Sequence, residues 1–143
     1  MINTSTGVSR SLLDTSYLLA LAFKRDQNHQ AATQHWQRAA ASSRQLITTS
    51  FILAEAVTFL NSRGYHAEAV ALGNNLLYGG PSLQFIHVDA DLLLAGWRYF
   101  QQHSDKDYSL ADCISFVVMR ELNITTALTF DRHFVQAGFL VEP

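Results

Sequence analysis

The stretch "YSLADCISFVVMRELNITTALTFDRHF", residues 108–134, joins a helix, a strand and two acids, and it decides the fold. Ser109 is followed three residues later by Asp112, which is the pattern of a capping box and predicts a helix that begins there. The apolar run 124–128 then predicts a buried strand, and Asp131 follows it. Two carboxylates therefore stand beside side chains that a core would bury, and their charge needs an explanation.

Short apolar runs alternate with segments of helical periodicity in the rest of the chain. We expect strands at 11–14, 45–48, 83–87, 124–128 and 139–141. We expect helices at about 17–23, 31–42, 50–64, 66–78, 90–99 and 110–122. This alternation predicts an α/β fold, in which a central short parallel sheet is flanked by helices on both faces.

Length and composition indicate one globular domain. We expect a flexible, small and polar tail at residues 1–9 and a single domain over 10–143. Hydrophobic residues make up 48% of the chain and charged residues 15%, which excludes a disordered protein. The net charge of −2 argues against a broad basic surface that would coat nucleic acid.

The single cysteine and the N-terminal apolar run exclude two further classes. Cys113 alone permits neither an intrachain disulfide nor a zinc site built on several thiolates. The apolar run 17–23 is too short to span a bilayer and has no small-residue cleavage site after it. We therefore expect a soluble, cytoplasmic protein that has no membrane partner.

Four acids fall where a parallel sheet would bind a ligand, outside the carboxyl ends of its strands. They are Asp14, Glu55, Asp112 and Asp131. Each also has a structural explanation. Asp14 and Asp131 could cap the next helix or turn, and Asp112 could serve only in the capping box. Glu55 shares its helical sector with apolar residues, so we expect it to need an arginine partner (Arg10 or Arg63) or a cation.

Taken together, the four acids favour a metal site. Carboxylates that converge in one cleft repel each other, and a proton or a divalent cation must relieve that repulsion. The matching positions hold no histidine or cysteine, so the ligands are oxygens, which favours Mg²⁺ or Mn²⁺ over zinc. We hypothesise that these acids bind metal.

The segments around the four acids resemble the PIN-domain nucleases, in particular the VapC-like toxin ribonucleases of type II toxin–antitoxin systems. The matching segments are "LLDTSYLLAL" at Asp14, "ILAEAVTFL" at Glu55, "DYSLADCISFVVM" at Asp112 and "ALTFDRHF" at Asp131. They span residues 11–134 in the family's order. Residues 64–104 match only in their helical character.

The resemblance implies a Rossmann-like sheet and Mg²⁺- or Mn²⁺-dependent hydrolysis of RNA phosphodiester bonds. Asp14, Asp112 and Asp131 would be the core metal ligands and catalytic residues, and Glu55 would complete the site directly or through a water. The resemblance also implies a cognate antitoxin as partner and a homodimer. The early helices, with Tyr17, Phe23 and Trp36, could form the dimer interface, although packing in the core explains these residues equally well.

Three hydroxyl residues near the acids are candidates for orienting carboxylates or waters. Thr15, Ser109 and Thr129 are close enough in sequence for this role, although Ser109 also serves as an N-cap and the two threonines could be ordinary turn hydroxyls. Arg132 and His133 directly follow Asp131. We expect a solvated arginine and a partly buried histidine there.

Two other functions remain open. A receiver-like phospho-acceptor signalling domain also gathers acids around Mg²⁺, but it expects paired acids after the first strand, where Thr15 and Ser16 follow Asp14. It also expects a lysine after the last strand, and no lysine follows Lys106. A non-catalytic PIN-fold binding protein is the third possibility, and only a cleavage assay separates it from an enzyme.

Overall fold

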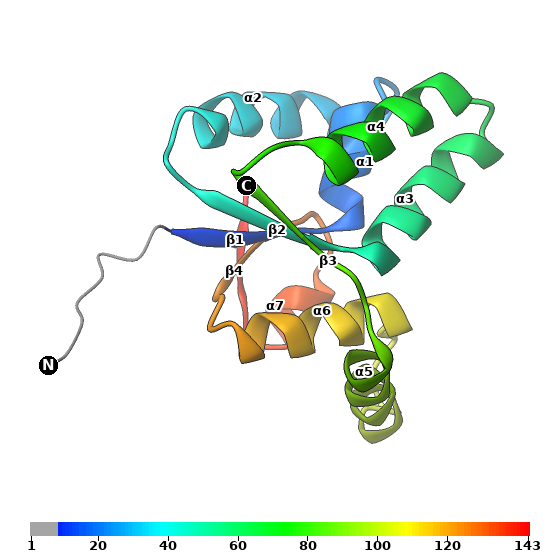
Figure 1. The fold of residues 1–143 in the computed structure, drawn as a ribbon, viewed down its shortest axis with the longest axis vertical. Helices are drawn as coiled ribbons and strands as arrows, with labels where there is room; N and C mark the ends of the chain where they lie inside the picture. The colour runs from blue at the N-terminus through cyan, green and yellow to red at the C-terminus, as the bar shows by residue number, and fades with distance from the viewer. Residues whose placement is uncertain (1–8) are drawn as a thin grey trace, which may run out of the picture.

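Five short parallel strands form one sheet in the computed structural model, which describes residues 9–143 (Figure 1). The strands are β1 (Arg10–Leu13), β2 (Gln45–Thr49), β3 (Leu83–Ile86), β4 (Thr126–Leu128) and β5 (Leu140–Glu142). Their order is β3-β2-β1-β4-β5, and every neighbouring pair is parallel. Leu12 in β1 lies between Ile47 of β2 and Ala127 of β4, and all three are fully buried. The centre of the sheet is therefore covered on both faces.

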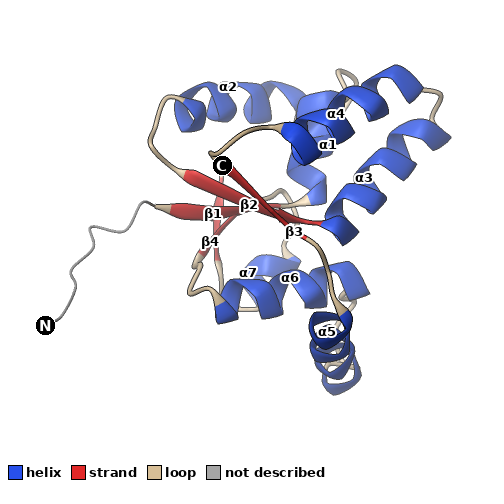
Figure 2. Ribbon diagram, in the orientation of Figure 1, coloured by secondary structure: helices blue, strands red, loops and turns tan. Residues whose placement is uncertain are grey.

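Helices lie on both sides of this sheet (Figures 1 and 2). One side carries α1 (Thr15–Ala22), α2 (His29–Ala40), α3 (Ser50–Ser62) and α4 (His66–Tyr78). The other side carries α5 (Ala90–Gln102), α6 (Leu110–Glu121) and the short α7 (His133–Gln136). The predicted fold class, an α/β sheet flanked by helices on both faces, is confirmed.

The local signals place most element ends within a few residues. Ser109 and Asp112 form the predicted capping box at the start of α6, and Asp89 accepts a hydrogen bond from the backbone N–H of Leu92 at the start of α5. The first strand was expected to include Asp14, but β1 ends at Leu13 and Asp14 is the N-cap position of α1. Helix α7 was not predicted, because four residues are too few to show a helical period.

Helix α6, which carries Asp112, is held by unusually close packing against α5. A Cβ built on Gly96 of α5 would lie 2.4 Å from Cγ1 of Ile114 in α6, so only glycine lets the two helices approach this closely. The buried ring of Phe116 on α6 also contacts Phe134 of α7 edge-on, with ring centroids 5.0 Å apart. Helices α5, α6 and α7 therefore pack as one layer under the sheet.

The last strand completes the sheet beside β4. The backbone N–H of Thr129 donates to the carbonyl of Glu142 (2.9 Å). The Glu142 side chain accepts from Arg44 and lies 2.8 Å from Nε2 of the buried His35. Burial raises the pKa of the neighbouring Tyr17 hydroxyl to about 12, and Tyr17 is wholly buried in the core, so it is not part of a surface interface.

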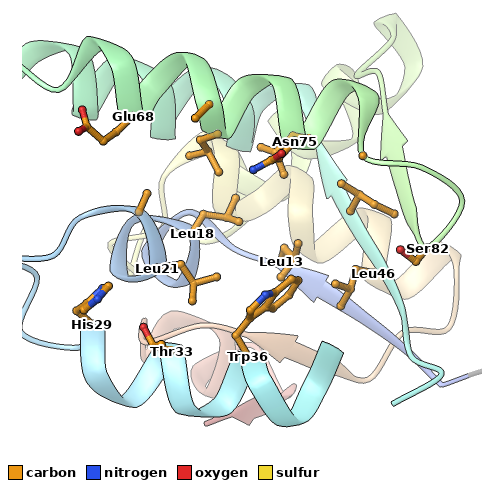
Figure 3. A pocket seen from close by; sticks show the side chains of 16 residues that line it. Leu13, Leu18, Leu21, His29, Thr33, Trp36, Leu46, Glu68, Asn75 and Ser82 are labelled. Carbon is orange, nitrogen blue, oxygen red and sulfur yellow. The ribbon is translucent and has the colours of Figure 1, made fainter. Parts of the chain in front are cut away.

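An apolar hollow lies on the α1–α4 side of the sheet (Figure 3). It has a volume of about 680 Å³, and we call it the apolar groove. Leu18 and Leu21 of α1, Trp36 of α2 and Leu13 of β1 point into it, while Asn75 of α4 lies on its far wall.

The sequence also predicted an N-terminal tail and the absence of a membrane-spanning segment. The predicted tail, residues 1–9, lies outside the described residues except for Ser9, whose carbonyl accepts a hydrogen bond from the backbone of Gln45. Among residues 9–143, no helix has the length and apolar character needed to cross a bilayer.

Candidate metal-binding site

A cavity of about 370 Å³ lies at the carboxyl ends of β1 and β4, and we call it the acid cavity. All four predicted acids line it: Asp14, Glu55, Asp112 and Asp131. The neighbouring strands bring two of them together, because the backbone N–H of Asp14 donates to the carbonyl of Leu128 at the end of β4 (3.1 Å). Segments that are distant in sequence therefore meet at one edge of the sheet, as the strand-end rule predicts.

Asp14 is the most deeply buried of the four acids. Its Oδ2 accepts hydrogen bonds from the hydroxyls of Thr129 (2.7 Å) and Ser16 (2.9 Å). Burial raises the pKa of Asp14 to about 6, the negative charge of Asp112 adds to the rise, and the two hydroxyls oppose it. The fold therefore holds a carboxylate where its charge is unfavourable unless a cation offsets it.

Asp112, Asp131 and His133 form a tighter group within the acid cavity. Each offers one ligand atom, and these atoms all lie within 4.8 Å of one another. Nδ1 of His133 is 3.0 Å from Oδ2 of Asp112 and 3.3 Å from Oδ1 of Asp131. Burial raises the pKa of Asp112, while the backbone N–H of Ser109 and the His133 side chain lower it. Asp14 and Glu55 line the same cavity outside this group of three.

Glu55 differs from its prediction. Its side chain is exposed on α3, so it bears no large desolvation cost, and the expectation of an apolar surrounding was wrong. Within residues 9–143, Glu55 forms no ion pair with either of the two arginines considered as partners. Arg10 donates to the carbonyl of Leu122, and the Arg63 guanidinium lies 4.7 Å from the centre of the Phe59 ring. Glu55 is therefore free to face the cavity.

The three candidate hydroxyls have different surroundings. Thr129 donates to Asp14, and the backbone N–H of Ser109 donates to Oδ2 of Asp112 (3.1 Å). Thr15 lines the cavity, and its buried Oγ1 has no hydrogen-bond partner among residues 9–143. The Thr129 hydroxyl thus holds a carboxylate directly, whereas the Ser109 hydroxyl accepts from the backbone N–H of Asp112 (3.0 Å). Thr15 leaves a polar atom available.

A comparison with known families identifies the architecture. A family model described as the PIN domain matches residues 11–140, nearly the whole chain. The chain belongs to the PIN-domain family.

Within the PIN-domain family, the chain is similar to VapC proteins. The chain is 35% identical over 128 residues to the 23S rRNA-specific endonuclease VapC20 from two strains of Mycobacterium tuberculosis, covering 90% of this chain and 94% of the relative. The solved structure of Mycobacterium tuberculosis VapC20, described as a Sarcin-Ricin loop cleaving toxin, matches with a TM-score of 0.82 and 33% identity. That match covers 92% of this chain and 97% of the solved one. The resemblance expected from the sequence is confirmed.

A more distant solved structure shows the fold alone. VapBC2 from Rickettsia felis, bound to a DNA fragment from its promoter, matches with a TM-score of 0.63 at 12% identity, covering 93% of this chain and 97% of that one. Membership of the PIN-domain family sets aside the receiver-like alternative. A non-catalytic PIN-fold protein is still consistent with these likenesses.

Sequence reasoning missed three residues that line the acid cavity: Ser16, Asp107 and His133. The Ser16 hydroxyl donates a hydrogen bond to Asp14 and accepts one from the backbone N–H of Phe130 (2.9 Å). It therefore links the segments that follow β1 and β4. His133 was expected only as a partly buried histidine. The four predicted positions are acids, but the His133 side chain contacts two of them, Asp112 and Asp131. The spacing of His133 two residues after Asp131 was the signal available, since a turn brings such neighbours together.

The residues in the acid cavity fit a divalent cation. The cavity lining offers five carboxylates (Asp14, Glu55, Asp107, Asp112 and Asp131) and one imidazole, that of His133. Carboxylate oxygens and imidazole nitrogens are donor types that Mg²⁺, Mn²⁺ and similar ions accept. The buried Asp14, with its raised pKa, and the unpartnered Thr15 hydroxyl are polar groups that a cation with its waters would satisfy. The donor set is thus compatible with a metal, although it is not made of oxygens alone.

Proposed function

We propose that this PIN domain is a divalent-metal-dependent endoribonuclease that hydrolyses RNA phosphodiester bonds in the acid cavity. One observation carries the proposal: acids from the ends of β1 and β4 and from α3 and α6 line a single cavity. The likeness to VapC20, a 23S rRNA-specific endonuclease, supports the reaction class.

Each acid has a proposed task. Asp14, Asp112 and Asp131 would hold the cation, and Glu55 at the exposed rim would complete the site directly or through a water. A bound divalent ion supplies Lewis-acid activation of water and neutralises charge on the phosphodiester group. Ser16 and Thr129 both donate to Oδ2 of Asp14, so the position of this carboxylate is set before substrate binds.

For the substrate, we propose a structured loop of ribosomal RNA in the cytoplasm. The support is the printed activity of VapC20 and of its solved structure, the Sarcin-Ricin loop cleaving toxin. The chain carries a net charge of −2, so non-specific phosphate attraction is weak. Recognition of one folded loop is compatible with such a surface, whereas coating of any RNA is not.

We further propose that the protein is the toxin of a toxin–antitoxin pair and forms a homodimer. VapBC2 of Rickettsia felis, which has the same fold, supports an antitoxin partner. Helix α5 exposes Leu94, Trp97 and Phe100, an apolar strip that a second copy would cover. Light scattering of the purified chain, alone and with the protein encoded by an adjacent gene, measures both assemblies.

The decisive test is cleavage of a labelled sarcin–ricin hairpin with Mg²⁺ or Mn²⁺, using a scrambled hairpin as the substrate control. We expect Asp112→Asn to lower the cleavage rate by about 10³-fold, because a ligand to the cation is lost. Asp91→Asn is the matched control, since Asp91 is an exposed acid in the first turn of α5. Full activity in folded Asp112→Asn protein, or in excess EDTA, would refute the proposal.

A further inference from the structure

His133 lies between two of the proposed metal ligands. Its Nδ1 is 3.0 Å from Oδ2 of Asp112 and 3.3 Å from Oδ1 of Asp131. The imidazole is oriented by its surroundings. The edge of its ring meets Tyr108, with centroids 5.5 Å apart and planes at 78°. The backbone N–H of His133 also donates to Oδ1 of Asp131 (2.9 Å), which fixes the two residues relative to each other.

The two nitrogen–oxygen separations in this group are those of adjacent ligands around one ion. Two ligand atoms that each lie about 2.1 Å from an octahedral ion are separated by about 3 Å when they are adjacent. The nitrogen–oxygen separations of 3.0 and 3.3 Å fall near this value without any movement of the side chains. The same separations suit a hydrogen bond from Nδ1, so the experiment must distinguish a bound metal from a shared proton.

We propose that Nδ1 of His133 is a metal ligand, and that it makes the site prefer Mn²⁺ over Mg²⁺. This inference rests on the proposed function, since it concerns the cation of that same site. Mg²⁺ takes oxygen ligands almost entirely, whereas imidazole nitrogen binds first-row transition ions more strongly. One nitrogen among the carboxylates therefore shifts selectivity toward Mn²⁺.

Pulsed electron paramagnetic resonance on the full chain loaded with Mn²⁺ tests the contact directly. The wild-type protein should show nitrogen-14 coupling to the bound Mn²⁺. His133→Ala should lose this coupling, and His66→Ala should retain it, because His66 is exposed on α4 and lies 2.9 Å from Asn61. The wild-type spectrum does not depend on the folding of any variant. Bound Mn²⁺ without nitrogen coupling would overturn the inference.

Calorimetric titration of the chain with each metal alone measures the selectivity. We expect His133→Ala to weaken Mn²⁺ binding by about 10- to 100-fold and Mg²⁺ binding by less than about threefold. His133→Asp, which offers an oxygen in place of the nitrogen, should move the preference toward Mg²⁺. Equal losses for both metals in His133→Ala would overturn the inference. Failure of the wild-type chain to bind either metal would instead refute the proposed function.

Discussion

The acid cavity and the apolar groove adjoin each other at the end of β1, yet they differ in size and in the side chains that line them. The groove is larger, about 680 Å³ against about 370 Å³, and leucines and Trp36 line it. The cavity is smaller, and it gathers carboxylates, hydroxyls and an imidazole. Leu13 at the end of β1 points into the groove, and the next residue, Asp14, lines the cavity. The edge of the sheet, and not the size of the hollow, locates the reactive groups.

The largest expected effect is on the rate of RNA cleavage, which substitutions in the acid cavity should lower and substitutions in the apolar groove should not. Asp14→Asn should reduce RNA cleavage by about 10³-fold, because a neutral amide cannot offset the charge of a cation. Trp36→Ala in the groove should leave the cleavage rate within about threefold and lower the free energy of unfolding by about 2 kcal/mol. Rates under saturating metal, with urea titrations for stability, measure both. A Trp36→Ala rate as low as that of Asp14→Asn would show that the groove takes part in the reaction.

The pH dependence of stability sharpens the contrast, because the carboxyl of Asp14 is buried, whereas that of Glu68, which lines the groove, is exposed. In the unfolded chain Asp14 ionises near 3.8, and in the folded protein near 6. Between these values the folded state holds a proton that the unfolded state has lost, so stability falls as the pH rises. Above pH 6 the free energy of unfolding is therefore lower by about 3 kcal/mol than below pH 3.8, as far as Asp14 is concerned.

The Asp14 contribution is isolated by comparing the wild-type chain with Asp14→Asn in urea titrations from pH 3.5 to 7 without metal. The raised pKa of Asp112 changes stability in the same direction, and the lowered pKa of Glu142 in the opposite one, but both are common to the two proteins. The variant should show the flatter profile. Identical slopes would mean that burial of Asp14 does not raise its pKa.

A smaller effect concerns the support of α6. Gly96→Ala should destabilise the protein by about 1–3 kcal/mol, because the new Cβ would meet Ile114 at 2.4 Å and force α5 away from α6. Gly73→Ala on α4 is the matched control. A Cβ there meets Val57 and Leu53 at 3.8 and 3.9 Å, so we expect a gain of about 0.5–1 kcal/mol. Thermal unfolding compares the two, and equal shifts would show that the α5–α6 packing adapts.

The sequence predicted the elements and the acids well because their signals are local. A capping box at Ser109 and Asp112 or a cap at Asp89 acts over three residues, and hydrophobic runs reveal buried strands directly. The convergence of four acids followed from one topological rule, that ligands bind at the carboxyl ends of parallel strands.

The missed features depend on contacts that no local pattern encodes. Ser16 reaches Phe130 only because β1 and β4 are neighbours in the sheet. His133 enters the acid group because α7 turns back toward the first turn of α6. Glu55 was placed in an apolar sector by its period, but helical period does not show where a covering element ends.

The hydrogen bond from Thr129 to Asp14 spans 115 residues, and the order of synthesis gives it a further meaning. Asp14 leaves the ribosome early, whereas Thr129 is aligned by Glu142 of β5, among the last residues of the sheet to be translated. At about 5–20 residues per second, several seconds separate the two ends. A nascent chain that stalls before β5 therefore lacks the strand that aligns Thr129 with Asp14, which delays assembly of the acid cavity until translation of the sheet is finished.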